Sequence, residues 1–335
     1  MKKILFLLAA FSSIMVVNPE VTVSNEYYSR SYIVMDGYSG DILEGKDYHL
    51  KRSVASISKI MTAIIAIESD KNFYVYTVSE EVVNIEGSSV YLKVDEQYRL
   101  IDLIYGLLLR SGNDAAYAIA DFICDSTEEF VYLMNQKAKE IGMANSNFSN
   151  PCGLDITDEG NISTSYDMAL LMKYCMNNEL FCKIIKTKEY RFDNKVYLNK
   201  NKLLKSYDYL LGGKTGYTSK AKRTLVTAAK KDEQYLIVVT LDCGSDYAFH
   251  KTLYENYFNK YNYIIFLKRG INYIDQFIFE SKNVVGMRME KEIILQGIKK
   301  YFINPYTRKL TISIIDRDGV EHQGGTFEGV RVIDK

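Results

Sequence analysis

The sequence is poor in histidine and carries no net charge, and each shortage excludes a class of site. Its 335 residues include three histidines, His49, His250 and His322, which lie far apart. Their separation argues against a histidine-rich metal site and against a Ser-His-Asp triad. A formal net charge of zero gives no indication of nucleic-acid binding. A nucleophile in this chain needs a base other than histidine.

Proline and cysteine are also scarce. Only three prolines occur in a chain whose residues are 47% apolar, which is typical of a globular protein with a substantial core. The length favours two domains. The five cysteines cannot all pair, and no histidine accompanies any of them in a recognisable motif. We interpret them mainly as buried apolar residues.

The N-terminus has the pattern of an export signal. A short basic start, Met1–Lys3, precedes an apolar segment over residues 4–17. That segment is too short to span a bilayer comfortably. We predict a signal peptide or N-terminal anchor over residues 1–24, with a buried N-terminal helix as the alternative. The expected location is outside the cytoplasmic membrane, with membrane contact only through this segment if it is not removed.

Ser56 and Lys59 lie three residues apart at the start of an apolar segment. Apolar residues at 57, 60, 61, 64 and 67 have the spacing of a helix with a buried face. Residues three apart on a helix are neighbours, so Lys59 can serve as the base for a Ser56 nucleophile. The same Ser-x-x-Lys pattern recurs at Ser219 in a polar stretch, so the spacing alone is not diagnostic.

Two later triplets complete a known set. Ser111-Gly112-Asn113 follows an apolar segment over residues 100–109, and Lys214-Thr215-Gly216 follows residues 210–213. Ser-x-Asn occurs again at 281–283, whereas Lys-Thr-Gly occurs once. These elements in this order are typical of serine β-lactamases and penicillin-binding proteins.

At this point the chain resembles the D-alanyl-D-alanine carboxypeptidases, the low-molecular-mass penicillin-binding proteins. The likeness extends to three connecting segments, Asn150–Leu154, Ser163–Ala169 and Asn199–Leu204, and covers roughly residues 30–260. It implies that Ser56 is the nucleophile and Lys59 its base. Ser111 would relay a proton to the leaving amine, and Asn113 would hold the substrate and Lys59. Burial and a second lysine would lower the pKa of Lys59 from its usual ~10.4.

The resemblance also implies a substrate-binding strand around Lys-Thr-Gly. Lys214, with the hydroxyls of Thr215 and Thr218, would receive the terminal carboxylate of the substrate. The backbone amides of Ser56 and of Tyr217, which follows Gly216, would form the oxyanion hole.

Two departures from the family pattern lie just after this strand. The family usually has an Ala-Gly pair here, whereas Ala221 in this chain is followed by Lys222 and Arg223. No arginine occurs between Arg223 and Arg269, where the family tends to carry one that binds substrate. We expect Lys214 to be the main carboxylate partner and Arg223 to point to solvent.

The order of segments predicts an α+β, or α/β layered, fold of the serine β-lactamase/transpeptidase type over residues 28–258. It would combine an antiparallel sheet with a helix cluster. Strand hairpins are expected at 32–44 and 225–241, and helices at 100–109, 115–123, 126–142 and 165–177. A small β-rich domain is expected over residues 259–335, with strands at 274–279, 284–289, 292–295 and 310–315.

The predicted function is that of a serine-type D-Ala-D-Ala carboxypeptidase. Its substrates would be peptidoglycan stem peptides, its covalent inhibitors β-lactams, and its role cell-wall organisation and cell shape. No cofactor, metal or nucleic-acid partner is expected. One alternative is a serine β-lactamase, for which Glu159 and Glu179 are the available deacylation bases. The other is a non-catalytic module that binds penicillin or cell wall.

Overall fold

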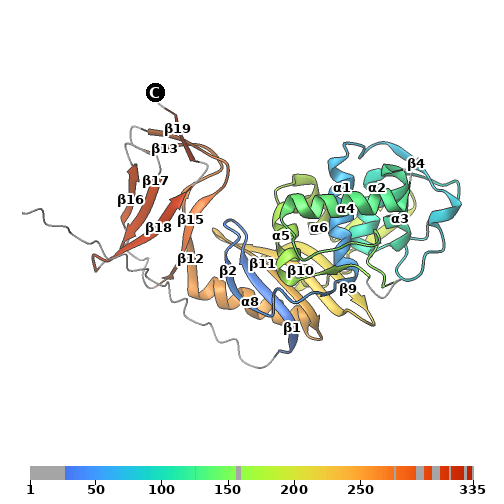
Figure 1. Ribbon diagram of the computed structural model, residues 1–335, viewed down its shortest axis with the longest axis horizontal. Coiled ribbons are helices and arrows are strands. Elements are labelled where there is room, and N and C mark those ends of the chain that lie inside the picture. Colours follow the sequence, from blue (N-terminus) through green and yellow to red (C-terminus); the bar gives the residue numbers. More distant parts are fainter. Residues whose placement is uncertain are drawn as a thin grey trace, which may run out of the picture.

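The computed structural model describes residues 27–124, 126–155, 160–274, 277–291, 298–303, 310–316, 318–327 and 330–333. The predicted N-terminal signal and the predicted strand at 292–295 lie outside these ranges. Figure 1 shows a region of mixed helix and sheet, from which a set of C-terminal strands extends to one side.

A five-stranded antiparallel sheet, in the order β2-β1-β11-β10-β9, forms the middle of the first region. β1 (Ser29–Asp36) and β2 (Ile42–Lys46) form the first predicted hairpin. β10 (Lys222–Lys231) and β11 (Gln234–Cys243) form the second. The edge strand β9 (Leu210–Thr218) carries the Lys-Thr-Gly triplet, in the position that the sequence predicts.

Alternation along the strands gives the sheet two apolar faces. Successive side chains point to opposite sides of a strand. In β11, Ile237 and Val239 face the helix cluster, whereas Leu236 and Val238 face helix α8 (Asp246–Lys260) on the other side. The sheet is therefore covered on both faces, with helices on each.

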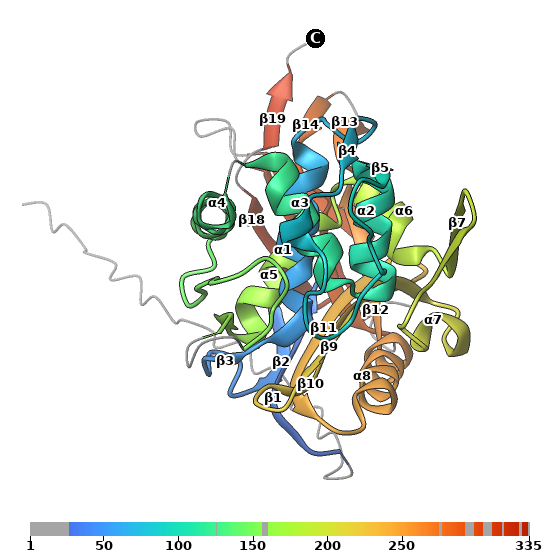
Figure 2. The same ribbon diagram turned by 90° about the vertical axis from the view of Figure 1, so that its right-hand side faces the viewer.

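Helix α1 (Lys59–Glu68) is the central helix of the cluster, because all its residues except Glu68 are buried. In Figure 2 the cluster lies in front of the sheet. The other members are α2 (Leu100–Tyr105), α3 (Asn113–Ile123), α4 (Thr127–Ile141), α5 (Ser165–Cys175) and α6 (Glu179–Lys186). Ser126 caps α4, since its Oγ accepts a bond from Glu129 N at 3.1 Å.

Short elements connect these layers. β3 (Arg52–Ser53) pairs with β6 (Ile162–Ser163), and β4 (Val75–Thr77) pairs with β5 (Gln97–Arg99). The hairpin of β7 (Glu189–Phe192) and β8 (Lys195–Leu198) precedes the one-turn helix α7 (Leu203–Ser206). No helix in the described part of the chain is long and apolar enough to cross a bilayer.

The C-terminal region is rich in β-strands, as predicted. Its strands are β12 (Tyr261–Leu267), β13 (Gly270–Ile274), β14 (Phe277–Ser281), β15 (Val285–Glu290), β16 (Ile298–Ile303), β17 (Leu310–Ile315), β18 (Glu321–Phe327) and β19 (Val330–Ile333). The predicted single strand at 274–279 is wrong. Ile274 ends β13 and Phe277 begins β14, and the two strands pair antiparallel.

Helix α8 was not anticipated, and it runs past the predicted domain limit at residue 258 as far as Lys260. The limit itself stays a prediction. Beyond α8, a buried ion pair joins the two regions: Arg288 Nη2 on β15 lies 2.6 Å from Asp36 Oδ2 at the end of β1. Arg288 Nη1 also donates to Gln234 Oε1 at 2.7 Å, so β15 is bonded to both β1 and β11.

Candidate active site

Ser56 lies in a 3₁₀ turn, Ala55–Ser58, that leads directly into α1. Its side chain is half-buried. Ala55 has φ = 50°, a left-handed conformation that a residue with a Cβ rarely adopts. Ser58 Oγ donates to Ala55 O at 2.8 Å and stabilises this turn. Such strain is found mainly where surrounding structure enforces it, often at functional sites.

Lys59 is completely buried and lies against the serine. Its Nζ donates to Ser56 Oγ at 2.9 Å, to Asn113 Oδ1 at 2.7 Å and to the backbone oxygen of Cys152. The pKa of Lys59 is lowered to about 8, mainly by burial and to a smaller extent by the charge of Lys200, whereas Cys152 and Asp114 act in the opposite direction. A lysine in this state supplies the neutral amine that a general base requires.

Ser111 and Asn113 reach the site from the end of the predicted helix 100–109. That segment is α2 followed by a wider π-helical turn, Gly106–Arg110, which ends at Ser111 with φ = 65°. Asn113 then begins α3 and is held in place twice: its N donates to Ser88 O and its Nδ2 to Glu86 O, both at 2.6 Å. The loop that carries Glu86 and Ser88 therefore forms one wall of the site.

Lys214 approaches from the sheet edge and closes the network. Its Nζ donates to Ser111 Oγ at 2.8 Å and to Thr215 O at 2.8 Å, and the side chain is buried. Burial, with the charges of Lys59 and Lys200, holds the pKa of Lys214 well below its usual value. Gly216 permits the close approach of β9, because a Cβ there would lie 3.0 Å from Ser56 N.

The remaining predicted binding residues continue along β9. The Tyr217 side chain is 67% exposed, and Thr215 is half-buried. Thr218 Oγ1 donates to Asp155 Oδ2 at 2.5 Å and accepts a bond from Ala221 N at 3.0 Å. A substrate carboxylate would have to compete with Asp155 for the Thr218 hydroxyl.

The Arg223 side chain is 43% exposed, but it also forms an ion pair that the sequence did not predict. Its guanidinium donates to both oxygens of Asp246, at 3.1 and 2.6 Å, and lies over the ring of Tyr247. Asp246 is almost completely buried at the start of α8. The helix was not predicted, so its buried carboxylate partner was not either.

Four groups at the site have no role in the sequence prediction: the Glu86 and Ser88 carbonyls, the Cys152 carbonyl and the Lys200 ammonium. Cys152 and Lys200 lie in two of the connecting segments that resemble the family, and that likeness is the signal that could have found them. The Glu86–Ser88 loop has no comparable motif. Glu179, one of the alternative bases, is exposed at the start of α6.

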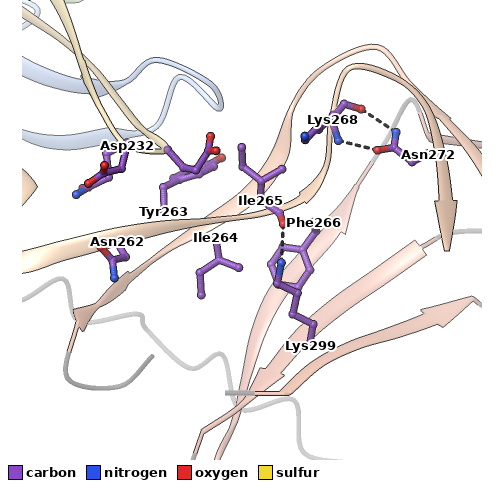
Figure 3. A pocket seen from close by; sticks show the side chains of 11 residues that line it. Asp232, Asn262, Tyr263, Ile264, Ile265, Phe266, Lys268, Asn272 and Lys299 are labelled. Carbon is purple, nitrogen blue, oxygen red and sulfur yellow. Dashed lines mark hydrogen bonds between the residues drawn. The ribbon is translucent and has the colours of Figure 1, made fainter. Parts of the chain in front are cut away.

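Two other features of the described residues lie apart from the predicted site: the buried His250 and a cavity beside β12. His250 is buried between Thr227 Oγ1 and Thr240 Oγ1, at 2.7 and 3.0 Å, and burial lowers its pKa to about 3, so it is a neutral core residue. Within the described ranges, no cluster of histidine, cysteine and acidic residues is arranged to hold a metal. A cavity of about 670 Å³ lies beside β12, and none of the predicted site residues lines it. At this cavity Lys299 Nζ donates to Ile265 O (Figure 3).

The cysteines match their interpretation as apolar residues. Four of the five are buried, and Cys182 is partly exposed. Burial raises the pKa of the Cys152 thiol, which lies closest to the site, so the thiol form is favoured there.

The fold and the placement of these motifs define a class: the serine transpeptidase fold shared by penicillin-binding proteins and DD-peptidases. Penicillin-binding protein 6B from Escherichia coli superposes with a TM-score of 0.76 over 94% of this chain and 98% of its own, at 24% identity. The D-alanyl-D-alanine carboxypeptidase from Mycobacterium tuberculosis H37Rv superposes with a TM-score of 0.66 over 69% of this chain and 90% of its own, at 29% identity.

The family is defined by sequence. The pattern of the D-alanyl-D-alanine carboxypeptidase family, peptidase S11, matches residues 17–245, and this chain belongs to that family. It is 36% identical over 227 residues to D-alanyl-D-alanine carboxypeptidase DacF of Bacillus subtilis, and 37% identical over 232 residues to DacC of Escherichia coli. The match covers 65% of this chain in both cases, but only 58% and 57% of those relatives.

Proposed function

We propose that this protein is a serine-type D-Ala-D-Ala carboxypeptidase that removes the terminal D-alanine from peptidoglycan stem peptides. The observation that carries the proposal is the buried Lys59 Nζ, 2.9 Å from Ser56 Oγ and depressed in pKa. Family membership supplies the substrate class. Ser56 is half-buried, so its hydroxyl is accessible to a peptide. Lys59 is completely buried and excluded from water.

In the acylation step, neutral Lys59 takes the proton of the Ser56 hydroxyl as Oγ attacks the peptide carbonyl. The backbone amides of Ser56 and Tyr217 stabilise the oxyanion. The C–N bond to the terminal D-alanine then breaks, and Ser111, which is bonded to Lys214, relays to the leaving amine the proton that Lys59 took from Ser56. Water hydrolyses the ester on Ser56 and restores the hydroxyl.

Asn113 and the strand β9 position the substrate. Asn113 Oδ1 accepts a bond from Lys59 Nζ, and Asn113 Nδ2 donates to Glu86 O in the loop that forms one wall of the site. Lys214, Thr215 and Thr218 receive the terminal carboxylate, and the Thr218 hydroxyl must leave Asp155 to do so. β-Lactams present a similar carbonyl and carboxylate, and they acylate Ser56 and inhibit the enzyme covalently.

The setting of this activity is the cell wall, at the outer face of the cytoplasmic membrane. The N-terminal signal pattern and the family support export, and trimming of stem peptides would influence cell-wall organisation and cell shape. No nucleic acid or cofactor takes part in the chemistry.

Labelled penicillin tests the proposal on the whole chain. We expect a slowly hydrolysed covalent adduct that Ser56→Ala abolishes without loss of the fold, as measured by circular dichroism. Ser58→Ala is the matched control, since it removes a hydroxyl that bonds Ala55 O and not the substrate; it should still label. Rapid turnover of penicillin would favour a β-lactamase, and the absence of any adduct would favour a binding module. Labelling of Ser56→Ala but not of Ser58→Ala would refute the assignment of the nucleophile.

A further inference from the structure

Lys200 is fixed at the rim of the site by its backbone. Its N donates to Leu109 O at 3.0 Å, two residues before Ser111 in the chain, and its O accepts a bond from the Tyr247 hydroxyl at 3.2 Å. The segment between β8 and α7 is thereby bonded both to the turn that delivers Ser111 and to the start of α8. An exposed lysine held in this way cannot move far from the site.

The ammonium of Lys200 is bonded to the opposite wall. Its Nζ donates to Ser88 Oγ at 2.8 Å, and Ser88 O accepts a bond from Asn113 N at 2.6 Å. Gly87, with φ = 92°, lies so close that a Cβ there would be 2.8 Å from Asn113 Nδ2. The bonds therefore run from Lys200 through Ser88 to Asn113, and from Asn113 to Lys59.

Lys200 also adds a positive charge beside two buried lysines. Its charge lowers the pKa of both Lys59 and Lys214. Cys152 and Asp114 raise the pKa of Lys59 and so oppose this effect. Partial burial of its side chain and the charge of Arg110 lower the pKa of Lys200 in turn.

We propose that Lys200 is a positioning residue of the active site, which holds the Glu86–Ser88 loop against Asn113 and places a positive charge beside Lys59 and Lys214. The inference rests on the proposed acyl-transfer function. Lys200 would act in two separable ways: its bond to Ser88 fixes the position of Asn113, and its charge, added to the larger effect of burial, lowers the pH at which Lys59 loses its proton.

The test is the acylation rate constant with labelled penicillin, measured from pH 6 to pH 10 for the full chain. Lys200→Met should lower the high-pH plateau about 3- to 10-fold and move the midpoint upward by about 0.5–1 pH unit, as expected for removal of one nearby cation. Lys200→Arg should restore the midpoint. Ser88→Ala should lower the plateau and leave the midpoint unchanged. In the double variant Lys200→Met/Ser88→Ala, the plateau should fall no further than in Lys200→Met.

Lys202→Met is the matched control, because the Lys202 side chain is exposed in the same segment; it should give the wild-type profile. If Lys200→Met also gives that profile while wild type is acylated, the inference is wrong. An unchanged plateau in Lys200→Met and Ser88→Ala would refute the loop contact, and an unchanged midpoint in Lys200→Met would refute the charge effect. If wild type is not acylated at any pH, the proposed function itself fails.

Discussion

Buried positive charge is treated in opposite ways in the active site and at the junction with the C-terminal strands. Arg288 at the junction is 10% exposed and pairs with Asp36, which is 3% exposed. Lys59 and Lys214 are as deeply buried, yet none of the ion pairs among the described residues includes either of them. Their partners are hydroxyls, an amide oxygen and carbonyls.

The difference lies in what each group must do. A paired arginine keeps its charge and fixes the orientation of two elements, whereas a buried lysine without a carboxylate readily loses its proton. At the junction, the Arg288–Asp36 pair fixes how β15 lies against β1. In the proposed mechanism, burying Lys59 without a carboxylate costs stability and provides a base that works near neutral pH.

The largest expected effect comes from removing the charge at the site. Lys59→Met should lower the acylation rate constant at least about 1,000-fold, because residues that act as one catalytic unit lose function together. The same change should raise the free energy of unfolding at pH 7 by about 1–2 kcal/mol, since it removes a buried charge whose folded pKa is depressed. Urea unfolding and penicillin labelling measure the two effects.

The pH dependence of wild type provides the control for this prediction. The pKa of Lys59 is about 8 in the folded state, and the unfolded chain binds the proton more tightly. The unfolding free energy contributed by this group therefore rises with pH from about 8 up to the unfolded value of ~10.4. The acylation rate constant should also rise as the pH increases through about 8, because Lys59 loses its proton there. A Lys59→Met protein less stable than wild type at pH 7 would contradict the comparison.

Breaking the pair at the junction should have the reverse outcome. Arg288→Met leaves Asp36 buried without its partner, and we expect a loss of about 3 kcal/mol in the free energy of unfolding. Acylation should stay at the wild-type rate. Lys260→Met is the control, since its 3.1 Å pair with Glu290 joins the same regions but is exposed, and the urea midpoint should change little. Loss of acylation in Arg288→Met would show that the junction controls the site.

The smallest expected effect separates the two cations near the substrate carboxylate. Lys214→Ala should reduce acylation by a D-Ala-D-Ala peptide more than about 30-fold, equivalent to ~2 kcal/mol, because Lys214 contacts Ser111 and faces the substrate. Arg223→Ala should change it less than about fivefold, because Asp246 neutralises the guanidinium. Both variants should be measured on the peptide and on its C-terminal amide. A large loss for Arg223→Ala confined to the free acid would reverse the assignment.

Local spacing was sufficient to predict the elements that carry the motifs. The helix beginning at Lys59 and the hairpin of β10 and β11 follow from apolar periods of 3.6 and 2. The contact between Ser56 and Lys59 follows as well, because residues three apart on a helical segment are neighbours. Helix α8 was not predicted. Its buried side chains are mainly tyrosine and phenylalanine, and charged residues between them hide the apolar periodicity.

The sequence by itself determined the family, the layered fold and which residues belong to the catalytic motifs. The tertiary structure decided how those residues are connected: Lys200 to Ser88, Thr218 to Asp155, and Arg223 to Asp246. Each of these bonds joins side chains from separate elements, and no local periodicity encodes such a pair. They depend on how strands and helices pack, which also sets the burial that lowers the pKa of Lys59.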